Sequence, residues 1–282
     1  MKKIILSLFV AAVSFTTNAQ IKTPAPSPSQ KIEQTVGLTN ISLEYSRPGV
    51  RGRTVFGDLV PYNKVWRTGA NSNTKITFST SVTVGGKTLK KGTYAIYTIP
   101  NATSWEVIFY SDSNNWGNPR KWDDSKVAAK ATARVDKVPF KVETFTITFD
   151  DLKSDSAVLG FIWENTMVSL PFSVPTDAIV SKQIDAKMAG PSAQDLYASA
   201  VYYLNSGKDI KQAQEWVDKA IKMTSSDPKF WMLRQQSLIH AKAGNKKGAI
   251  KAAKESLKYA EIAKNAGYIK MNKASLKEWG AK

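Results

Sequence analysis

The chain has 282 residues, with 40 Lys and Arg against 23 Asp and Glu, which gives a formal net charge of +17. It contains no cysteine and one histidine, so disulfide scaffolds, thiol catalysis and the usual zinc or iron–sulfur sites are excluded, and we expect no metal site and no cofactor. Hydrophobic residues make up 42% of the chain and aromatic residues 10%, which suffices for a buried core and argues against global disorder.

Residues 1–19 have the pattern of a secretory signal peptide. Two lysines precede an apolar run from Ile4 to Phe15, and small residues stand before the junction between Ala19 and Gln20. This run is shorter than the ~20 residues of a membrane-spanning helix. We therefore expect cleavage before Gln20 and export to the periplasm or the medium, with no integral membrane segment in the mature chain. The proline-rich residues 20–30 then predict an extended, weakly packed tether.

Residues 31–187 have the pattern of a β domain. Apolar and polar residues alternate with a period of two in about ten short segments, with no helical pattern between them. Gly85-Gly86 predicts a tight hairpin, and we expect a second hairpin at Glu164-Asn165. The fold class expected is mainly β, an antiparallel β-sandwich of jelly-roll type. The expected strands are Lys31–Val36, Thr39–Tyr45, Lys75–Phe78, Val82–Val84, Tyr94–Ile99, Trp105–Tyr110, Thr132–Val138, Glu143–Phe149, Ala157–Trp163 and Met167–Val174.

The most unusual segment of this domain runs from Tyr45 to Asn71. Four arginines fall within 21 residues, among glycines and prolines that hold the loop on a fixed path. Arginine binds carboxylates, phosphates or sulfates through paired hydrogen bonds, and a neighbouring aromatic ring offers a flat face to a sugar or base. The segment predicts a site for an anionic or polar ligand; alternatively, the arginines pair with Glu44 and Asp58 and only hold the loop. The candidate ligand-binding residues are Arg47, Arg51, Arg53, Tyr62, Trp66, Arg67 and Asn71.

Several motifs of the same region resemble a known family. In chain order they are Tyr45–Pro48, Arg51–Arg53, Phe56–Tyr62, Val65–Asn71 and Lys91–Pro100. They are similar to the exported, Bacteroidetes-type proteins grouped as domain of unknown function 2911. The resemblance covers about Ser29 to Pro175 and implies an exported protein that often adds a helical, repeat-like tail. It implies no substrate, cofactor or catalytic residue.

Standard catalytic motifs are not completed in this sequence, and we expect no catalytic residue. Gly52 to Gly57 has P-loop glycine spacing, but Asp58-Leu59 follows where Lys and Ser/Thr must meet phosphate and magnesium. His240 is expected at a helix-packing position, with a structural role. The pairs Asp123-Asp124 and Asp150-Asp151 are expected in caps or turns, because adjacent strand residues point to opposite faces.

A second loop, Asn114 to Asp124, is rich in turn residues and carries two tryptophans. On a sandwich rim these residues could stack on a carbohydrate, and Asp112 with Asp123 and Asp124 could bind calcium, without the regular spacing of calcium loops. Alternatively, the tryptophans fold the loop against the sheet. The secondary candidates for a ligand are Trp116, Arg120 and Trp122.

After Gly190-Pro191 the apolar period becomes 3.6 residues, which predicts an α-helical domain over residues 191–282. Small residues after Gly207 recur after Gly244, so the segment resembles tetratricopeptide repeats, with Asp209 as an extra residue in the first unit. The expected helices are Ala193–Asn205, Ile210–Met223, Pro228–Ala243 and Lys247–Asn265, with a short one near Ser275.

The helical domain is the more basic part of the chain. Residues 191–282 carry 17 basic and 8 acidic side chains, net +9, whereas residues 20–190 carry 21 and 15, net +6. All but one of the 17 are lysines spread over every expected helix, which is typical of a solvated surface. Nucleic acid is therefore not an expected partner, although attraction to an anionic polymer or lipid is the alternative.

These patterns together predict an exported two-part protein that binds a ligand and does not catalyse a reaction. The expected ligand is anionic or polar, such as an envelope glycan. Two alternatives stay open. One is a carboxylate-dependent glycan hydrolase, which a cluster of acids in a cleft of the β domain would favour. The other is a helical-repeat scaffold that holds a protein partner.

Overall fold

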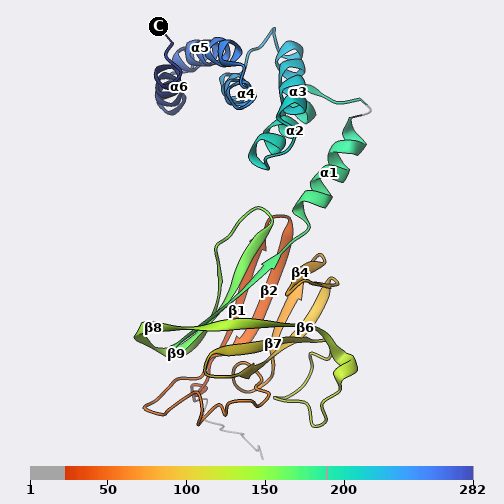
Figure 1. Cartoon of the computed structure of the whole chain (residues 1–282), viewed down its shortest axis with the longest axis vertical. Helices are drawn as coiled ribbons and strands as arrows, with labels where there is room; N and C mark the ends of the chain where they lie inside the picture. The colour runs from red at the N-terminus through yellow and green to blue at the C-terminus, as the bar shows by residue number, and fades with distance from the viewer. Residues whose placement is uncertain (1–22, 189, 282) are drawn as a thin grey trace, which may run out of the picture. The chain divides into compact units, whose positions relative to one another are not determined.

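The computed structural model describes residues 23–188 and 190–281, so the expected signal peptide and its cleavage site lie outside the described residues. The chain divides into two compact units, one up to Pro175 and one from Thr176 onward. Strands form the first unit and helices form the second (Figure 1). Within the described ranges, no helix is long and apolar enough to cross a membrane.

The β unit is an antiparallel sheet with the hydrogen-bonded order β1-β2-β3-β6-β7-β8-β9-β4-β5. This confirms the prediction of a mainly β, antiparallel fold that is followed in the chain by a helical part. The Gly85-Gly86 hairpin is also confirmed, with φ values of 54° and 73° that suit a tight turn. The strands are β1 (Ser29–Val36), β2 (Thr39–Ser46), β3 (Thr74–Phe78), β4 (Val82–Val84), β5 (Lys87–Leu89), β6 (Gly92–Pro100), β7 (Ser104–Tyr110), β8 (Val127–Asp150) and β9 (Ser156–Ser173).

Two long strands, β8 and β9, join the halves of this sheet. The first part of β8 pairs with β7, and the part from Val135 onward pairs with β9. The expected hairpin at Glu164-Asn165 is wrong, because β9 runs through both residues. Glu164 takes a φ of 55°, and Asn165 Nδ2 donates to the carbonyl of Phe140 at 2.9 Å, opposite a register shift in β8. Such a bulge bends a strand pair without ending it.

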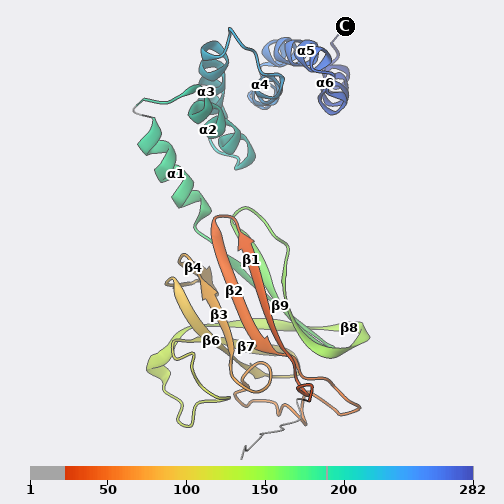
Figure 2. The ribbon, with the colours of Figure 1, turned by 180° about the vertical axis from the view of Figure 1, so that it is seen from behind.

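The main core lies between the two halves of the sheet, whose faces oppose each other (Figure 2). Alternate side chains point inward, and the largest buried ones include Trp105, Phe145 and Trp163, each at most 2% exposed. The segment after β2 is fixed to β8, since the Val50 N–H donates to the Glu143 carbonyl at 2.8 Å. The start of the arginine-rich loop is therefore anchored on the core.

A smaller cluster lies on the outer face of β6 and β7. It contains Ala95, Tyr97, Ile108 and Tyr110, whose strand neighbours point into the main core instead. Trp122 packs against it from the second loop. This face of the sheet is thus partly covered by residues 111–126.

The second unit consists of successive helices. The β domain was expected to extend to Lys187, but the last part of that range is a helix. This helix, α1 (Thr176–Lys187), begins directly after Pro175, which has no N–H group to donate to a strand ladder. From α2 onward each helix packs on the next, and α4 also contacts α2 and α6. The other helices are α2 (Ala193–Asn205), α3 (Ile210–Met223), α4 (Phe230–Lys242), α5 (Lys246–Ile262) and α6 (Ala266–Glu278).

Candidate functional site

A cavity of about 360 Å³ lies within the arginine-rich segment of the β unit. We call it the arginine groove and define it by the predicted residues that line it: Arg51, Arg53, Trp66, Arg67 and Asn71. Five of the seven predicted residues are therefore brought together, although they are up to 20 positions apart in the sequence.

Arg47 and Tyr62, the other two predicted residues, are not among the residues that line the groove. The Arg47 guanidinium donates from Nε to the Phe145 carbonyl at 3.0 Å and from Nη2 to Thr146 Oγ1 at 2.6 Å, which fixes the loop to β8. Tyr62 packs on Gly57, where a Cβ would lie 3.0 Å from the ring and φ is +95°. Both side chains support the loop.

The arginines of the groove are held by backbone carbonyl groups. Arg53 donates from Nη2 to the Gly49 carbonyl at 2.7 Å and from Nε to the Val50 carbonyl at 3.0 Å. Arg67 Nη1 donates to the carbonyl of Asn71 at 2.9 Å, and Arg51 Nη2 donates to that of Pro26. Each contact satisfies an N–H group but leaves the formal charge without a counter-charge.

The alternative of pairing with Glu44 and Asp58 is not observed. Every Asp and Glu of the chain lies in the described residues, and none of them forms an ion pair with the four arginines of the loop. The Glu143 carboxylate does reach the segment, but it accepts from the main-chain N–H of Arg51 at 2.8 Å. Three arginines and no acidic side chain line the groove, so its guanidiniums repel one another unless an anion lies among them.

The loop around the groove has a strained backbone. Arg51, Thr68 and Asn71 have φ values of 51°, 56° and 59°, a region that non-glycine residues rarely adopt. Thr68 is β-branched and fully buried; its Oγ1 donates to Thr98 Oγ1 at 3.1 Å, and its carbonyl accepts from Thr74 Oγ1 at 2.5 Å. Each such residue costs about 1–3 kcal/mol, and such strain clusters at functional sites.

Trp66 forms a rigid wall of the groove. Its ring stacks on Trp163 with centroids 5.9 Å apart and meets the edge of Phe145 at 5.1 Å. The indole N–H donates to the Gly69 carbonyl at 3.1 Å. The ring is consequently fixed in place before any ligand arrives.

The end of the expected tether lies against the groove. Pro26 and Ser27 are among its lining residues. Three successive carbonyls are bound: Pro26 by Arg51, Ser27 by Asn71 Nδ2 at 3.3 Å, and Pro28 by the Arg47 main-chain N–H at 2.9 Å. Sequence reasoning did not find these contacts, because a carbonyl group is present at every residue and carries no compositional signal.

Residues 27–172 match the family model described as Protein of unknown function (DUF2911), which is more than half of the chain. The chain belongs to the DUF2911 family. This confirms the family predicted from the motifs between Tyr45 and Pro100, and the DUF2911 region contains every arginine of the groove. Comparisons with curated proteins and with solved structures gave no match.

In this DUF2911 domain Trp122 packs the second loop against the sheet, as one of the two predictions stated for both tryptophans, whereas Trp116 does not. Trp122 packs on Tyr110 and Tyr97, with centroids 4.7 and 5.6 Å apart. The phenol of Tyr97 donates to the Gly117 carbonyl at 3.1 Å, and burial raises its pKa to about 12. Of the other two secondary candidates, Trp116 is 80% exposed and Arg120 is also exposed.

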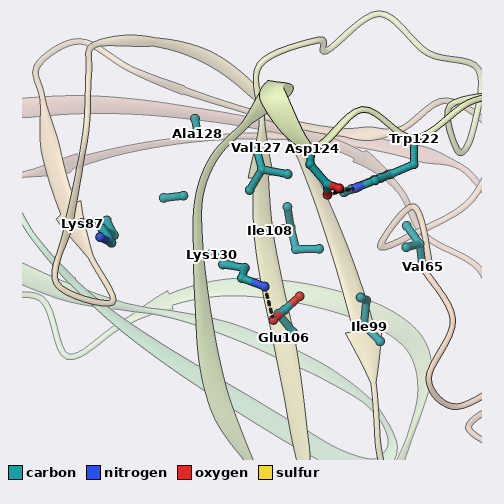
Figure 3. Close-up of a pocket in the computed structure, with 11 residues that line it drawn as sticks. Val65, Lys87, Ile99, Glu106, Ile108, Trp122, Asp124, Val127, Ala128 and Lys130 are labelled. Atoms are coloured by element: carbon teal, nitrogen blue, oxygen red, sulfur yellow. Dashed lines mark hydrogen bonds and ion pairs between the residues drawn. The ribbon is translucent and has the colours of Figure 1, made fainter.

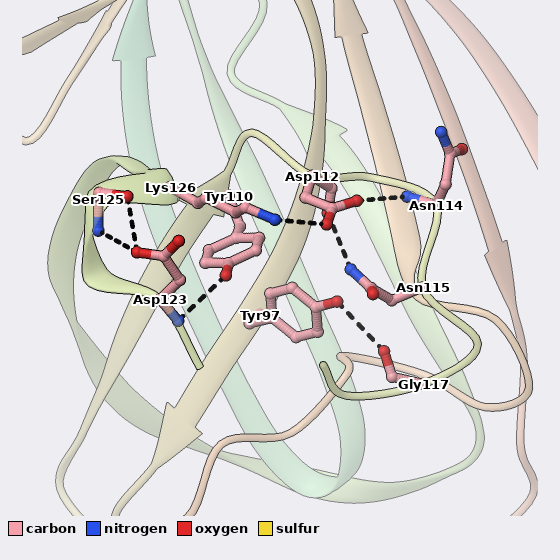
Figure 4. A network of polar contacts seen from close by, with 9 residues as sticks. All are labelled: Tyr97, Tyr110, Asp112, Asn114, Asn115, Gly117, Asp123, Ser125 and Lys126. Carbon is pink, nitrogen blue, oxygen red and sulfur yellow. Dashed lines mark hydrogen bonds and ion pairs between the residues drawn. The ribbon is translucent and has the colours of Figure 1, made fainter. Parts of the chain in front are cut away.

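The acids of this DUF2911 loop are used within the loop itself (Figure 4). Asp112 Oδ2 lies 2.9 Å from Lys126 Nζ, whose hydrogen bond lowers the pKa of that carboxyl. Asp123 caps a short 3-10 helix at Asp124–Lys126 by accepting from the Ser125 N–H. Among the described residues, no group of three or more His, Asp and Glu is placed to hold a metal ion.

His240 of the DUF2911 protein has a structural position in the helical unit, as expected. It is 7% exposed, its Nε2 lies 2.7 Å from Asp218 Oδ1, and its Nδ1 lies 3.0 Å from Asn245 Nδ2. Burial alone would raise the pKa of Asp218, but hydrogen bonds from His240 and Gln236 lower it overall. The contacts of His240 join α4 to Asp218 of α3 and to Asn245, the N-cap of α5.

Proposed function

We propose that this DUF2911 protein is an exported binding protein that holds an anionic ligand in the arginine groove and catalyses no reaction on it. One observation carries the proposal: Arg51, Arg53 and Arg67 line one cavity and are anchored by neutral carbonyl groups. An anion in this cavity gains charge-assisted hydrogen bonds, which are about twice as strong as neutral ones. It also relieves the repulsion between the guanidiniums.

The shape of the groove suits a single carboxylate, phosphate or sulfate group on a ring. Its volume of about 360 Å³ is near the lower end of small-molecule sites, which span roughly 300–1,000 Å³. Trp66 offers a flat wall for the ring, and Asn71 adds an amide that can bond a hydroxyl. An acidic sugar of the cell envelope combines these features.

The side chains around the groove are suited to binding and not to proton transfer. Arginine stays protonated in proteins, so it neither gives nor takes a proton near neutral pH. The other lining groups are an amide, indole rings, aliphatic side chains, backbone and the hydroxyl of Ser27, with no histidine or carboxylate beside it among the lining residues. The export part of the proposal is supported by the lysines, the apolar run and the small residues before Gln20.

Replacing single arginines tests the proposal. We expect Arg51→Ala and Arg67→Ala to melt close to wild type, because their partners are carbonyls and no buried carboxylate is left unpaired. Binding of galacturonate, hexose phosphate or a short Asp/Glu peptide, measured by titration calorimetry, should weaken by about tenfold or more, which is about 1.4 kcal/mol. Arg51→Lys should keep only part of the wild-type affinity, because lysine lacks the planar guanidinium that forms paired hydrogen bonds.

Arg134→Ala is the matched control. Arg134 is an exposed arginine of the same unit, paired with Asp136 at 2.6 Å, and it does not line the groove. Its removal should leave both melting and binding unchanged. A large drop in the melting temperature of the Arg51 and Arg67 variants, with no ligand bound by wild type, would show that the arginines only stabilise the loop.

A further inference from the structure

A second cavity, of about 550 Å³, lies on the outer face of the β unit (Figure 3). It stands over β6, β7 and the first part of β8, on the opposite side of these strands from the main core, and it shares no lining residue with the arginine groove. We call it the outer cavity. Apolar side chains form its floor: Val65, Ile99, Ile108 and Val127.

The charged residues of the outer cavity balance one another. Lys87 and Lys130 supply two positive charges, and Glu106 and Asp124 supply two negative ones. Glu106 Oε2 lies 3.0 Å from Lys130 Nζ, and Asp124 Oδ1 accepts from the Trp122 indole N–H at 2.9 Å. A cavity with no net charge does not select an anion or a cation, in contrast to the arginine groove.

Paired charges at the rim of an apolar floor suit hydroxyl groups. A hydroxyl is donor and acceptor at once, so it can accept from an ammonium group and donate to the carboxylate beside it. Both bonds are charge-assisted and short. Because the Glu106–Lys130 pair is solvent-exposed, with 32% and 61% of the two side chains accessible, opening it for a ligand costs little.

The wall of the outer cavity is held in place before a ligand binds. Trp122 packs on Tyr110 and Tyr97, and the loop that carries it is tied down by the Lys126–Asp112 pair and by the Tyr97 phenol (Figure 4). A rigid site loses less conformational entropy on binding, which raises affinity.

We propose that the outer cavity binds a neutral, hydroxyl-rich ring compound, an uncharged saccharide unit. The C–H face of the ring lies on Ile99 and Ile108, and its hydroxyls bond the Glu106–Lys130 pair at one end and Asp124 at the other. The volume is within the range of small-molecule sites. This site is separate from the anion site proposed above, and either can fail without the other.

The test uses the full mature chain and a panel of neutral gluco-, galacto- and manno-configured disaccharides, with saturation-transfer NMR and titration calorimetry. We expect at least one disaccharide to bind and to shift the Trp122 indole resonance. Glu106→Gln should weaken its binding by about tenfold, because a charge-assisted bond becomes a neutral one. Glu33→Gln is the matched control, since it breaks another exposed lysine–glutamate pair, Lys31–Glu33 at 2.7 Å.

A filling variant gives a second, independent readout. Ala128 lines the cavity and is exposed, so Ala128→Trp should abolish saccharide binding while the melting temperature stays near that of wild type. Three results would each overturn the proposal: no disaccharide binds wild type below about 10 mM; Glu106→Gln and Glu33→Gln bind equally; or binding is lost in Arg51→Ala, which would place the saccharide in the arginine groove.

Discussion

The β unit and the helical unit differ in the side chains that fill their interiors. The β unit buries large rings such as Trp105, Phe145 and Trp163, whereas the described helical unit buries no Phe, Tyr or Trp and many alanines, such as Ala213 and Ala253, beside its leucines. Large rings stabilise by the apolar area they remove from water, at roughly 25 cal/mol per Å². Small residues stabilise by letting helices approach closely. The β unit should therefore be most sensitive to lost atoms, and the helical unit to added ones.

The largest expected effect comes from emptying the aromatic core. Phe145 is fully buried and meets the rings of Tyr45, Trp66 and Trp163, so Phe145→Ala should lower the free energy of unfolding of the β unit by about 3–5 kcal/mol. Phe140→Ala, on the same strand with 58% of its surface exposed, is the control and should cost little. Denaturant unfolding followed by tryptophan fluorescence measures both; equal losses would contradict the role given to burial.

A pH series isolates one buried phenol of the β unit. Because burial raises the pKa of Tyr97 to about 12, the folded state favours the neutral phenol. The contribution of the neutral phenol to the free energy of unfolding is fully present below the ordinary pKa near 10. It is lost as pH rises through about 12, a loss of about 2–3 kcal/mol. Urea unfolding between pH 9 and 12 should show a shallower decline in Tyr97→Phe than in wild type. Parallel curves for the two proteins would show that ionisation of Tyr97 does not contribute to the loss of stability at high pH.

Adding one methyl group to the helical unit should be harmful at one glycine and helpful at another. A Cβ at Gly248 would lie 2.2 Å from His240 Nδ1 and 2.7 Å from Asn245 Nδ2, so Gly248→Ala should destabilise by about 1–3 kcal/mol. At Gly267 the Cβ would meet only Asn265 Oδ1 at 3.5 Å. Gly267→Ala should therefore stabilise by up to about 1 kcal/mol. Helix melting at 222 nm compares the two; a Gly248→Ala variant as stable as wild type would contradict the sensitivity of the helical unit to added atoms.

The smallest expected effect lies at the end of α5. Lys264 is exposed, follows the helix C-cap and has a φ of 52°, a left-handed conformation that glycine adopts without penalty. Lys264→Gly should stabilise the helical unit by about 1 kcal/mol. A lower melting temperature for this variant would show that the lysine side chain contributes more than its backbone strain costs.

The sequence predicted best what is decided locally. The bounds of α2 match the expectation because Ser192 and Asp195 form a capping box beside the first helical turn. The arginine cluster was also visible, since its residues lie close together in the chain. Its partners were not: Arg47 bonds Phe145, which is 98 residues away, and β8 brings both halves of the sheet together through one continuous strand. No local pattern records such distant pairings, and α1 was missed because its apolar residues do not gather on one face.

The register shift in β8 has a consequence for how this domain can change in length. Along most of β8 an inserted residue would turn every later side chain to the other face of the sheet. Between Lys137 and Val142 the pairing is already interrupted, and Phe140 points to solvent. Insertional mutagenesis should therefore find residues 138–141 permissive while neighbouring stretches of the strand are not, which makes this bulge a natural place to graft a tag, a reporter or a second domain.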